Sequence, residues 1–143
     1  MSLLRSISAP AEALLGSSAL AHVVTVNRSG MPQVSVVWCG VEGDRVYFCS
    51  RRDSVKVRNL TSDPRILLSI EDEARNRAGT QRHLVVYGRA RVVGDADAEI
   101  CDRLCRIYTG SADHPANLKH DPTAVRIDVE VDRIGGNGPW TVA

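Results

Sequence analysis

The stretch that decides the fold is residues 32–41, which read Pro-Gln-Val-Ser-Val-Val-Trp-Cys-Gly-Val. Valines alternate with polar residues over its first half, a pattern typical of a strand with one buried and one half-buried face. Residues 42–44 read Glu-Gly-Asp and predict a tight hairpin turn. Further strands are expected on either side, over residues 19–27 and 45–50. These segments together predict an antiparallel meander of three strands.

Three more strands are expected later in the chain, over residues 65–71, 82–93 and 123–134. Branched aliphatic side chains alternate with polar ones in each of them. Gly88 lies in the middle of the second of these strands and indicates a bulge or a close backbone approach. Six strands with short connections favour a closed antiparallel barrel over a doubly wound sheet. The fold class is therefore mainly β, with short helices.

Short helices are expected at three places. Ser8 is a candidate N-cap for the first, and either Asp53 or Ser54 for the second, which should end near Leu60. Asp95 is expected to cap the third, which should run to about residue 108 with an apolar stripe along one side.

Two segments are expected to lie outside regular structure. Residues 71–81 are polar and charged and should form a long exposed loop. Residues 135–143 show no periodicity and should form an irregular tail. Because an exposed tryptophan is unfavourable, Trp140 in this tail is expected to dock over the ligand groove or against the partner subunit. Trp38 is expected to be a packing residue rather than a ligand contact.

The composition narrows the class of protein. The chain has 143 residues, which fits one domain over residues 1–143, and its net charge is +1. A neutral domain is not expected to bind nucleic acid, which recruits strongly basic surfaces. No apolar run is long enough to span a membrane and no secretory segment opens the chain, so a cytoplasmic protein is expected.

The cysteines and histidines predict no metal site. The four cysteines show no C-x-x-C spacing, and the four histidines show no paired spacing. Cys101 and Cys105 would share one helix face and are expected to be buried free thiols. Free thiols are consistent with a reducing compartment.

Four cations and one acid lie within residues 50–60, where a strand leads into the second helix. Arg51 and Arg52 suit bidentate contacts with a phosphate, and Lys56, one of two lysines in the chain, offers a point charge. The N–H groups at a helix N-terminus favour an anion at the same place. The cluster predicts either a phosphate cradle or a solvated charged turn.

The chain resembles the pyridoxamine 5'-phosphate oxidase-like superfamily, and within it the flavin/deazaflavin-dependent oxidoreductases of actinobacteria, the B group. The resemblance rests on the order of three segments: residues 27–38 around Gly-Met-Pro, Lys56-Val-Arg-Asn-Leu with the following Asp63-Pro64, and Gly88-Arg-Ala. It covers about residues 9–134. Each motif is weak alone, and their order and spacing carry the comparison.

This resemblance implies a six-stranded split β-barrel that forms a homodimer and holds its cofactor between the two subunits. It places the cofactor ring along the second strand and the phosphate at Lys56, with Arg58 and Asn59 continuing the motif. Many relatives carry an arginine two residues before this lysine, where the present chain has Ser54. The ring-contacting residues implied are Gln33, Val34, Ser35, Val36 and Val37.

The function expected from the resemblance is hydride transfer from reduced coenzyme F-420 to a small unsaturated organic substrate. An FMN-dependent oxidase or reductase is the alternative within the same fold, and a non-catalytic module that binds flavin or haem is the alternative outside enzymes. Arg51 and Arg52 favour F-420, because its anionic tail is longer than that of FMN. The cofactor would supply the chemistry, so no catalytic acid or base is expected in the chain.

Overall fold

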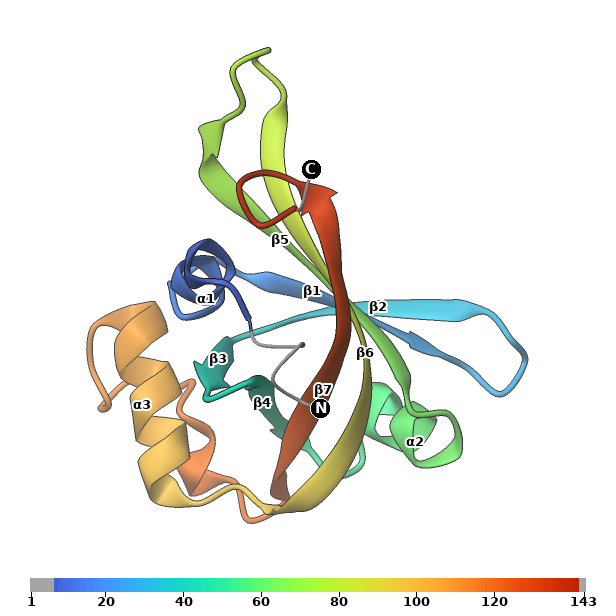
Figure 1. The fold of residues 1–143 in the computed structure, drawn as a ribbon. Helices are drawn as coiled ribbons and strands as arrows, with labels where there is room; N and C mark the ends of the chain where they lie inside the picture. Colours follow the sequence, from blue (N-terminus) through green and yellow to red (C-terminus); the bar gives the residue numbers. More distant parts are fainter. Residues whose placement is uncertain (1–6, 142–143) are drawn as a thin grey trace.

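One antiparallel sheet dominates the computed structural model of the chain, which describes residues 7–141 (Figure 1). The described residues contain seven strands in the order β2-β1-β5-β6-β7-β4-β3. The strands are β1 (Ala21–Val26), β2 (Pro32–Val37), β3 (Cys39–Glu42), β4 (Arg45–Arg51), β5 (Arg65–Arg75), β6 (Gln81–Asp95) and β7 (Ala124–Asn137). The helices are α1 (Ala9–Leu15), α2 (Val55–Ser62), α3 (Ala98–Thr109) and the short 3-10 helix η2 (Leu118–His120).

The sheet closes into a barrel through Trp38. Strand β2 pairs with β1 up to Val37, whereas β3 pairs with β4 from Cys39 onward, so β2 and β3 lie at the two edges of the sheet. Trp38 alone separates these edge strands along the chain, and the edges must therefore lie next to each other. The prediction of one strand over residues 32–41 is wrong for this reason, and seven strands replace the six expected.

Tyr108 of α3 fixes the chain at this break. Its hydroxyl accepts a hydrogen bond from the Cys39 N–H at 3.0 Å and lies 2.9 Å from the Cys39 carbonyl oxygen. Its ring stacks on Trp38, with centroids 5.4 Å apart and planes 10° apart. Polar groups at the change of sheet partner are thus satisfied by a side chain.

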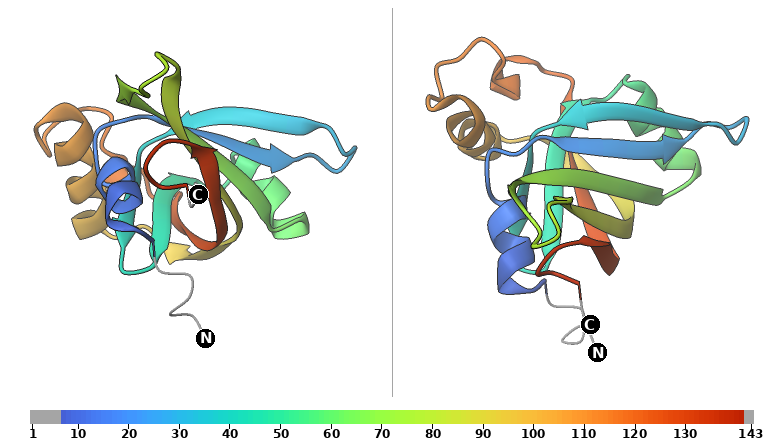
Figure 2. Two further views of the ribbon diagram at one scale, coloured as in Figure 1. Left: turned by 45° about the horizontal axis from the view of Figure 1, so that its top comes forward. Right: turned by 90° about the horizontal axis from the view of Figure 1, so that it is seen from above.

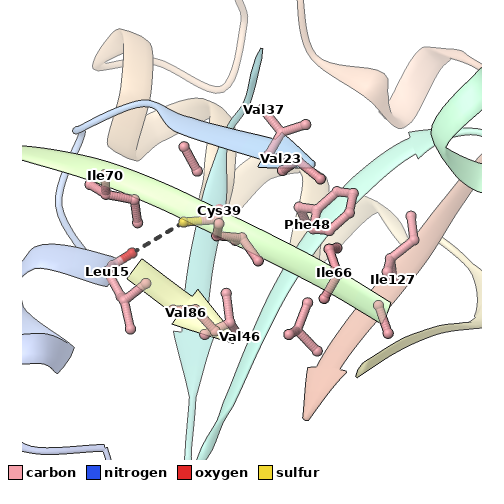
Figure 3. Packing of buried hydrophobic residues seen from close by; sticks show 14 of the residues in the cluster. Leu15, Val23, Val37, Cys39, Val46, Phe48, Ile66, Ile70, Val86 and Ile127 are labelled. Atoms are coloured by element: carbon pink, nitrogen blue, oxygen red, sulfur yellow. Dashed lines mark hydrogen bonds between the residues drawn. The ribbon is translucent and has the colours of Figure 1, made fainter. Parts of the chain in front are cut away.

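The barrel interior is filled by the aliphatic side chains that the alternation predicted (Figure 3). Ile66, Ile70, Val86 and Ile127 are buried against Phe48, the one phenylalanine in the chain. Gly88 meets the predicted close approach, because a Cβ there would lie 2.3 Å from the carbonyl oxygen of Glu130. The strand register also shifts between Tyr87 and Gly88.

Two of the three predicted helix caps are confirmed. The Ser8 and Ser54 side chains accept hydrogen bonds from the backbone at the starts of α1 and α2. The prediction of Asp95 as the cap of α3 is wrong, and Asp97 caps that helix instead through a 2.8 Å bond from Ile100 N. Asp95 still pairs with Val125 in the sheet, so it cannot also begin the helix.

The two predicted irregular segments are shorter than expected. Strands β5 and β6 extend to Arg75 and Gln81 and form a projecting hairpin, which leaves residues 76–80 as its turn (Figure 1). The tail prediction over residues 135–143 is wrong at its start, since β7 continues to Asn137 and residues 135–137 pair with β6. Residues 142–143 lie outside the described range.

Trp140 docks, but in the core of its own chain and outside the pocket lining, not over the ligand groove or a partner subunit as expected. It is 5% exposed and belongs to the core of its own chain, and its Nε1 donates to the carbonyl oxygen of His83 at 3.0 Å.

Figure 2 shows how the helices surround the barrel: α3 lies along one side, and α2 lies near the opposite end, below the β1–β2 hairpin. Among the helices that the structure describes, none is long and apolar enough to cross a membrane.

Candidate functional site: a pocket between the barrel and α3

A pocket of about 520 Å³ opens where the sheet changes from β2 to β3. Four parts of the chain line it: the end of β2 with Trp38, the end of β4, the start of α2, and α3 with the loop after it. The lining residues are Leu20, Val36, Val37, Trp38, Cys49, Ser50, Arg51, Asp53, Ser54, Lys56, Cys101, Leu104, Ala116 and Leu118.

One end of the pocket is apolar. Val36, Val37 and Trp38 form one wall, and Leu104 and Leu118 form the facing wall. Trp38 is held in place by its stack on Tyr108. A flat, apolar ring system is the kind of ligand that such walls accept, because burial of apolar surface drives its binding.

The other end of the pocket is polar and lies at the N-terminus of α2. The hydroxyls of Ser50 and Ser54 are 3.1 Å apart, and Ser54 also accepts a hydrogen bond from Val57 N. Lys56 lies half-buried beside them. Asp53 adds one carboxylate, so the positive charge of this end comes from Lys56 and Arg51.

Lys56 has no carboxylate partner among residues 7–141, whereas Lys119 pairs with Asp102 at 2.9 Å. Partial burial lowers the pKa of the Lys56 ammonium, since desolvation disfavours the charged form. A half-buried, unpaired cation in a pocket wall is costly unless an anion joins it. The residues at this end therefore fit a phosphate.

The three predicted phosphate-binding arginines lie in different environments. Arg51 lines the pocket and is exposed, with an ion pair to Asp121 at 3.3 Å. Arg52 lies outside the pocket lining and pairs with Asp95 at 2.8 Å. Arg58 is exposed on α2 and also lies outside the lining. Exposed ion pairs are weak, so Arg51 remains free to exchange its partner for a ligand.

Asn59 and Gln33 belong to a hydrogen-bonded network that anchors α2 to the sheet. The Asn59 amide donates to Thr25 Oγ1 at 3.1 Å and to Asn27 Oδ1 at 2.9 Å. Thr25 in turn donates to Gln33 Oε1 at 3.2 Å. Neither Asn59 nor Gln33 lines the pocket, and their contribution to the site is to hold the helix that carries Lys56.

The remaining predicted ring contacts lie on two faces of β2. Val36 and Val37 line the pocket, as the resemblance implied for the ring. Val34 lies on the same outer face as Val36 and is 58% exposed, but it is not part of the pocket lining. Ser35 is half-buried, and its hydroxyl has no hydrogen-bond partner within residues 7–141.

Sequence reasoning missed the wall that α3 contributes. Cys101 and Leu104 of α3, and Leu118 after it, lie about 50 residues or more from β4 along the chain, and no local pattern connects these segments. Trp38 was expected to pack, and it both packs and lines the pocket. Burial raises the pKa of the Cys49 thiol, which also lines the pocket, to about 12.

Replacing Tyr108 with phenylalanine should destabilise the protein by about 1–3 kcal/mol, since the Cys39 N–H and carbonyl would lose their partner in a half-buried position. That loss corresponds to a fall in the melting temperature of roughly 2–12 °C for a chain of this length. Calorimetry of Tyr108→Phe measures it. Tyr87→Phe is the matched control, because Tyr87 contacts Arg133 through its ring. Equal losses in both variants would contradict the role of the Tyr108 hydroxyl.

The chain belongs to the pyridoxamine 5'-phosphate oxidase family, whose sequence profile matches residues 7–136. The barrel is the split β-barrel of that superfamily, which confirms the fold predicted from the sequence. No curated protein matches the chain.

Several solved structures are similar to this chain. One is named as an F-420 reductase, with 25% identity and a TM-score of 0.70 over 87% of this chain and 94% of that one. A conserved hypothetical protein of Mycobacterium tuberculosis has 20% identity and a TM-score of 0.74 over 90% and 82% of the two chains. A haem-binding protein of Mycobacterium smegmatis has 19% identity and a TM-score of 0.62, over 90% of this chain and 52% of its own. The last two show the fold alone. Family membership together with the first neighbour supports a flavin-related oxidoreductase function.

Proposed function

We propose that this protein is an oxidoreductase that binds coenzyme F-420 and transfers a hydride to a small unsaturated organic substrate. The observation that carries this proposal is Lys56, an unpaired and half-buried cation at the polar end of an otherwise apolar pocket. The pocket volume of about 520 Å³ lies within the range of roughly 300–1,000 Å³ that is usual for small-molecule sites. The similarity to a protein named as an F-420 reductase supports the choice of cofactor.

Different residues of the pocket would bind the ring and the phosphate of the cofactor. Trp38 and Leu104 would exclude water from a bound ring, and Val36 and Val37 would contact it at the end of β2. Lys56, with the hydroxyls of Ser50 and Ser54, would hold the phosphate. A bound deazaflavin supplies the hydride itself, so the protein's contribution is position and a dry environment.

FMN is the second candidate cofactor, because the same pocket offers one phosphate site beside an apolar wall. The arginines that favour F-420 are fewer than expected from the sequence. Arg51 lines the pocket, but Arg52 does not. The arginines between Arg75 and Arg82 also offer charge for a long anionic tail, but the β5–β6 hairpin that carries them projects away from α2 within one chain (Figure 1).

Titration of the protein with both cofactors tests the choice between them. We expect F-420 to bind up to about fivefold more tightly than FMN at low salt, because Arg51 in the pocket lining adds one exposed contact to its tail, worth about 0.2–1 kcal/mol. The preference should shrink as salt screens this contact. Tighter binding of FMN at low salt would support the FMN-dependent alternative. Binding without reduction of any unsaturated substrate would support the non-catalytic module.

We also propose that the protein is a homodimer. An apolar surface that includes Leu20, just before β1, Val34 and Val36 of β2, and Leu67 of β5 is exposed on the outside of the sheet. Leu20 and Val36, each 50% exposed, also line the pocket, so this surface reaches the pocket's rim. A second copy placed over it would cover the apolar side chains and complete the pocket.

A further inference from the structure

Two thiols face the pocket from different elements. Cys49 comes from β4 and Cys101 from α3, and both line the apolar end. Each thiol contributes to the pKa shift of the other, so the two side chains lie within interaction range at the shared pocket wall. All four cysteines are free and buried, but Cys39 and Cys105 are not part of the pocket lining.

The surrounding packing fixes this pair. Ile100 and Leu104 flank Cys101 on α3 and pack with Tyr47 and Cys49 of β4 in one apolar cluster. Cys101, between these two residues on the helix, is 3% exposed and lines the same pocket as Cys49. Cys105 lies one turn further along α3, where its sulfur contacts the Thr109 hydroxyl at 3.7 Å.

We propose that Cys49 and Cys101 form a dithiol site for thiophilic electrophiles that accept two sulfur ligands, and specifically for monosubstituted trivalent arsenicals. Two soft donors alone do not make a tetrahedral metal site, which needs four ligands. Within residues 7–141 no cluster of three or more histidine, cysteine or acidic side chains could hold a metal ion. An acceptor with two exchangeable positions and one apolar substituent matches two thiols beside Trp38 and Leu104.

The reaction balances without an oxidant. Two S–H bonds and two As–OH bonds break, two As–S bonds form, and each thiol proton leaves with a hydroxide as water. Arsenic stays trivalent throughout. An aryl substituent on arsenic would lie along the apolar wall formed by Val37 and Trp38.

Because both thiols are protonated, they should react differently with arsenicals than with alkylating or oxidising reagents. Burial raises the pKa of both thiols, so both are protonated at neutral pH. Alkylation and oxidation by peroxide require the thiolate and should be slow. Condensation with As–OH takes up the thiol proton in the same step and does not need a free thiolate.

Phenylarsine oxide and intact-mass measurement test the site on the whole protein. We expect phenylarsine oxide to add one phenylarsenic group per chain with the loss of two hydrogens. Iodoacetamide at the same concentration should leave both thiols unmodified. A dithiol such as dithiothreitol should remove the group, and a monothiol should not. Cys49→Ala and Cys101→Ala should each abolish the adduct, whereas Cys105→Ala should retain it. An adduct lost in Cys105→Ala and kept in Cys49→Ala would assign the site to the helix pair instead and overturn the proposal.

Peptide mapping of the wild type gives a readout that no folding defect can disturb. Trypsin cleavage after arginine places Cys49 in residues 46–51, Cys101 in residues 92–103 and Cys105 in residues 104–106. The arsenic should link the first two peptides. A link between the last two would refute the proposal. FMN should slow the reaction if it occupies this pocket, and lack of protection would count against the proposed cofactor site while leaving the dithiol intact.

Discussion

Replacing Lys56 with alanine should weaken cofactor binding by roughly 10- to 150-fold, because a charge-assisted contact to phosphate contributes about 1.5–3 kcal/mol. The lysine has no ion-pair partner within residues 7–141, so its removal should leave the fold intact. Fluorescence titration with FMN and with F-420 measures the affinity, and a thermal melt without cofactor measures the stability.

Lys56→Met is the second variant, since it keeps most of the apolar stem and removes only the charge. Its melting temperature without cofactor should equal or exceed that of the wild type, because the charge is partly desolvated in the free protein. Arg58→Ala is the matched control from the same helix, as Arg58 is exposed outside the pocket. Equal affinities in Lys56→Ala, Arg58→Ala and the wild type would place the phosphate elsewhere.

Patterns within single strands and helices were sufficient to predict most of the fold. The alternation over residues 65–71 and 123–134 identified β5 and β7 with their buried faces, and Ser8 and the pair Asp53-Ser54 marked two helix starts. These signals are local, because a strand's period and a helix cap depend on a few neighbouring residues. The break at Trp38 was not predictable in this way. It depends on Tyr108, which lies 70 residues further along the chain and satisfies the backbone at the break.

The candidate site was predictable only in part, for the same reason. The basic run that contains Lys56 could be found, because it is continuous in the sequence. The facing wall from α3 could not, because tertiary packing alone brings Leu104 and Cys101 to β4. Asn59 shows a further limit: the motif that contains it marks the right helix, but its side chain points into the network with Thr25 and Asn27.

Introducing aspartate at Val34 should convert the protein from a dimer to a monomer. Val34 is 58% exposed and pairs with Val24 on β1, which pairs with Leu67 on β5, so these side chains form one apolar row across three strands. A dimer over this face would bury one carboxylate from each subunit. Burial of an unpaired charge costs several kcal/mol per ion. The dissociation constant of the dimer should therefore rise by at least about 1,000-fold.

Sedimentation velocity at micromolar concentration distinguishes the outcomes. The wild type should sediment as a dimer and Val34→Asp as a folded monomer with the far-UV spectrum of the wild type. Val93→Asp is the matched control, because Val93 is an exposed valine near the end of β6, away from the row of Val34, Val24 and Leu67. A monomeric wild type would remove the proposed interface. A dimeric Val34→Asp would mean that the interface lies on another face, and the pocket rim at Leu20 and Val36 would then remain open to solvent.

If the interface completes the pocket, Val34→Asp should also weaken cofactor binding. The lost affinity should return as the protein concentration rises, a dependence that Lys56→Ala should not show.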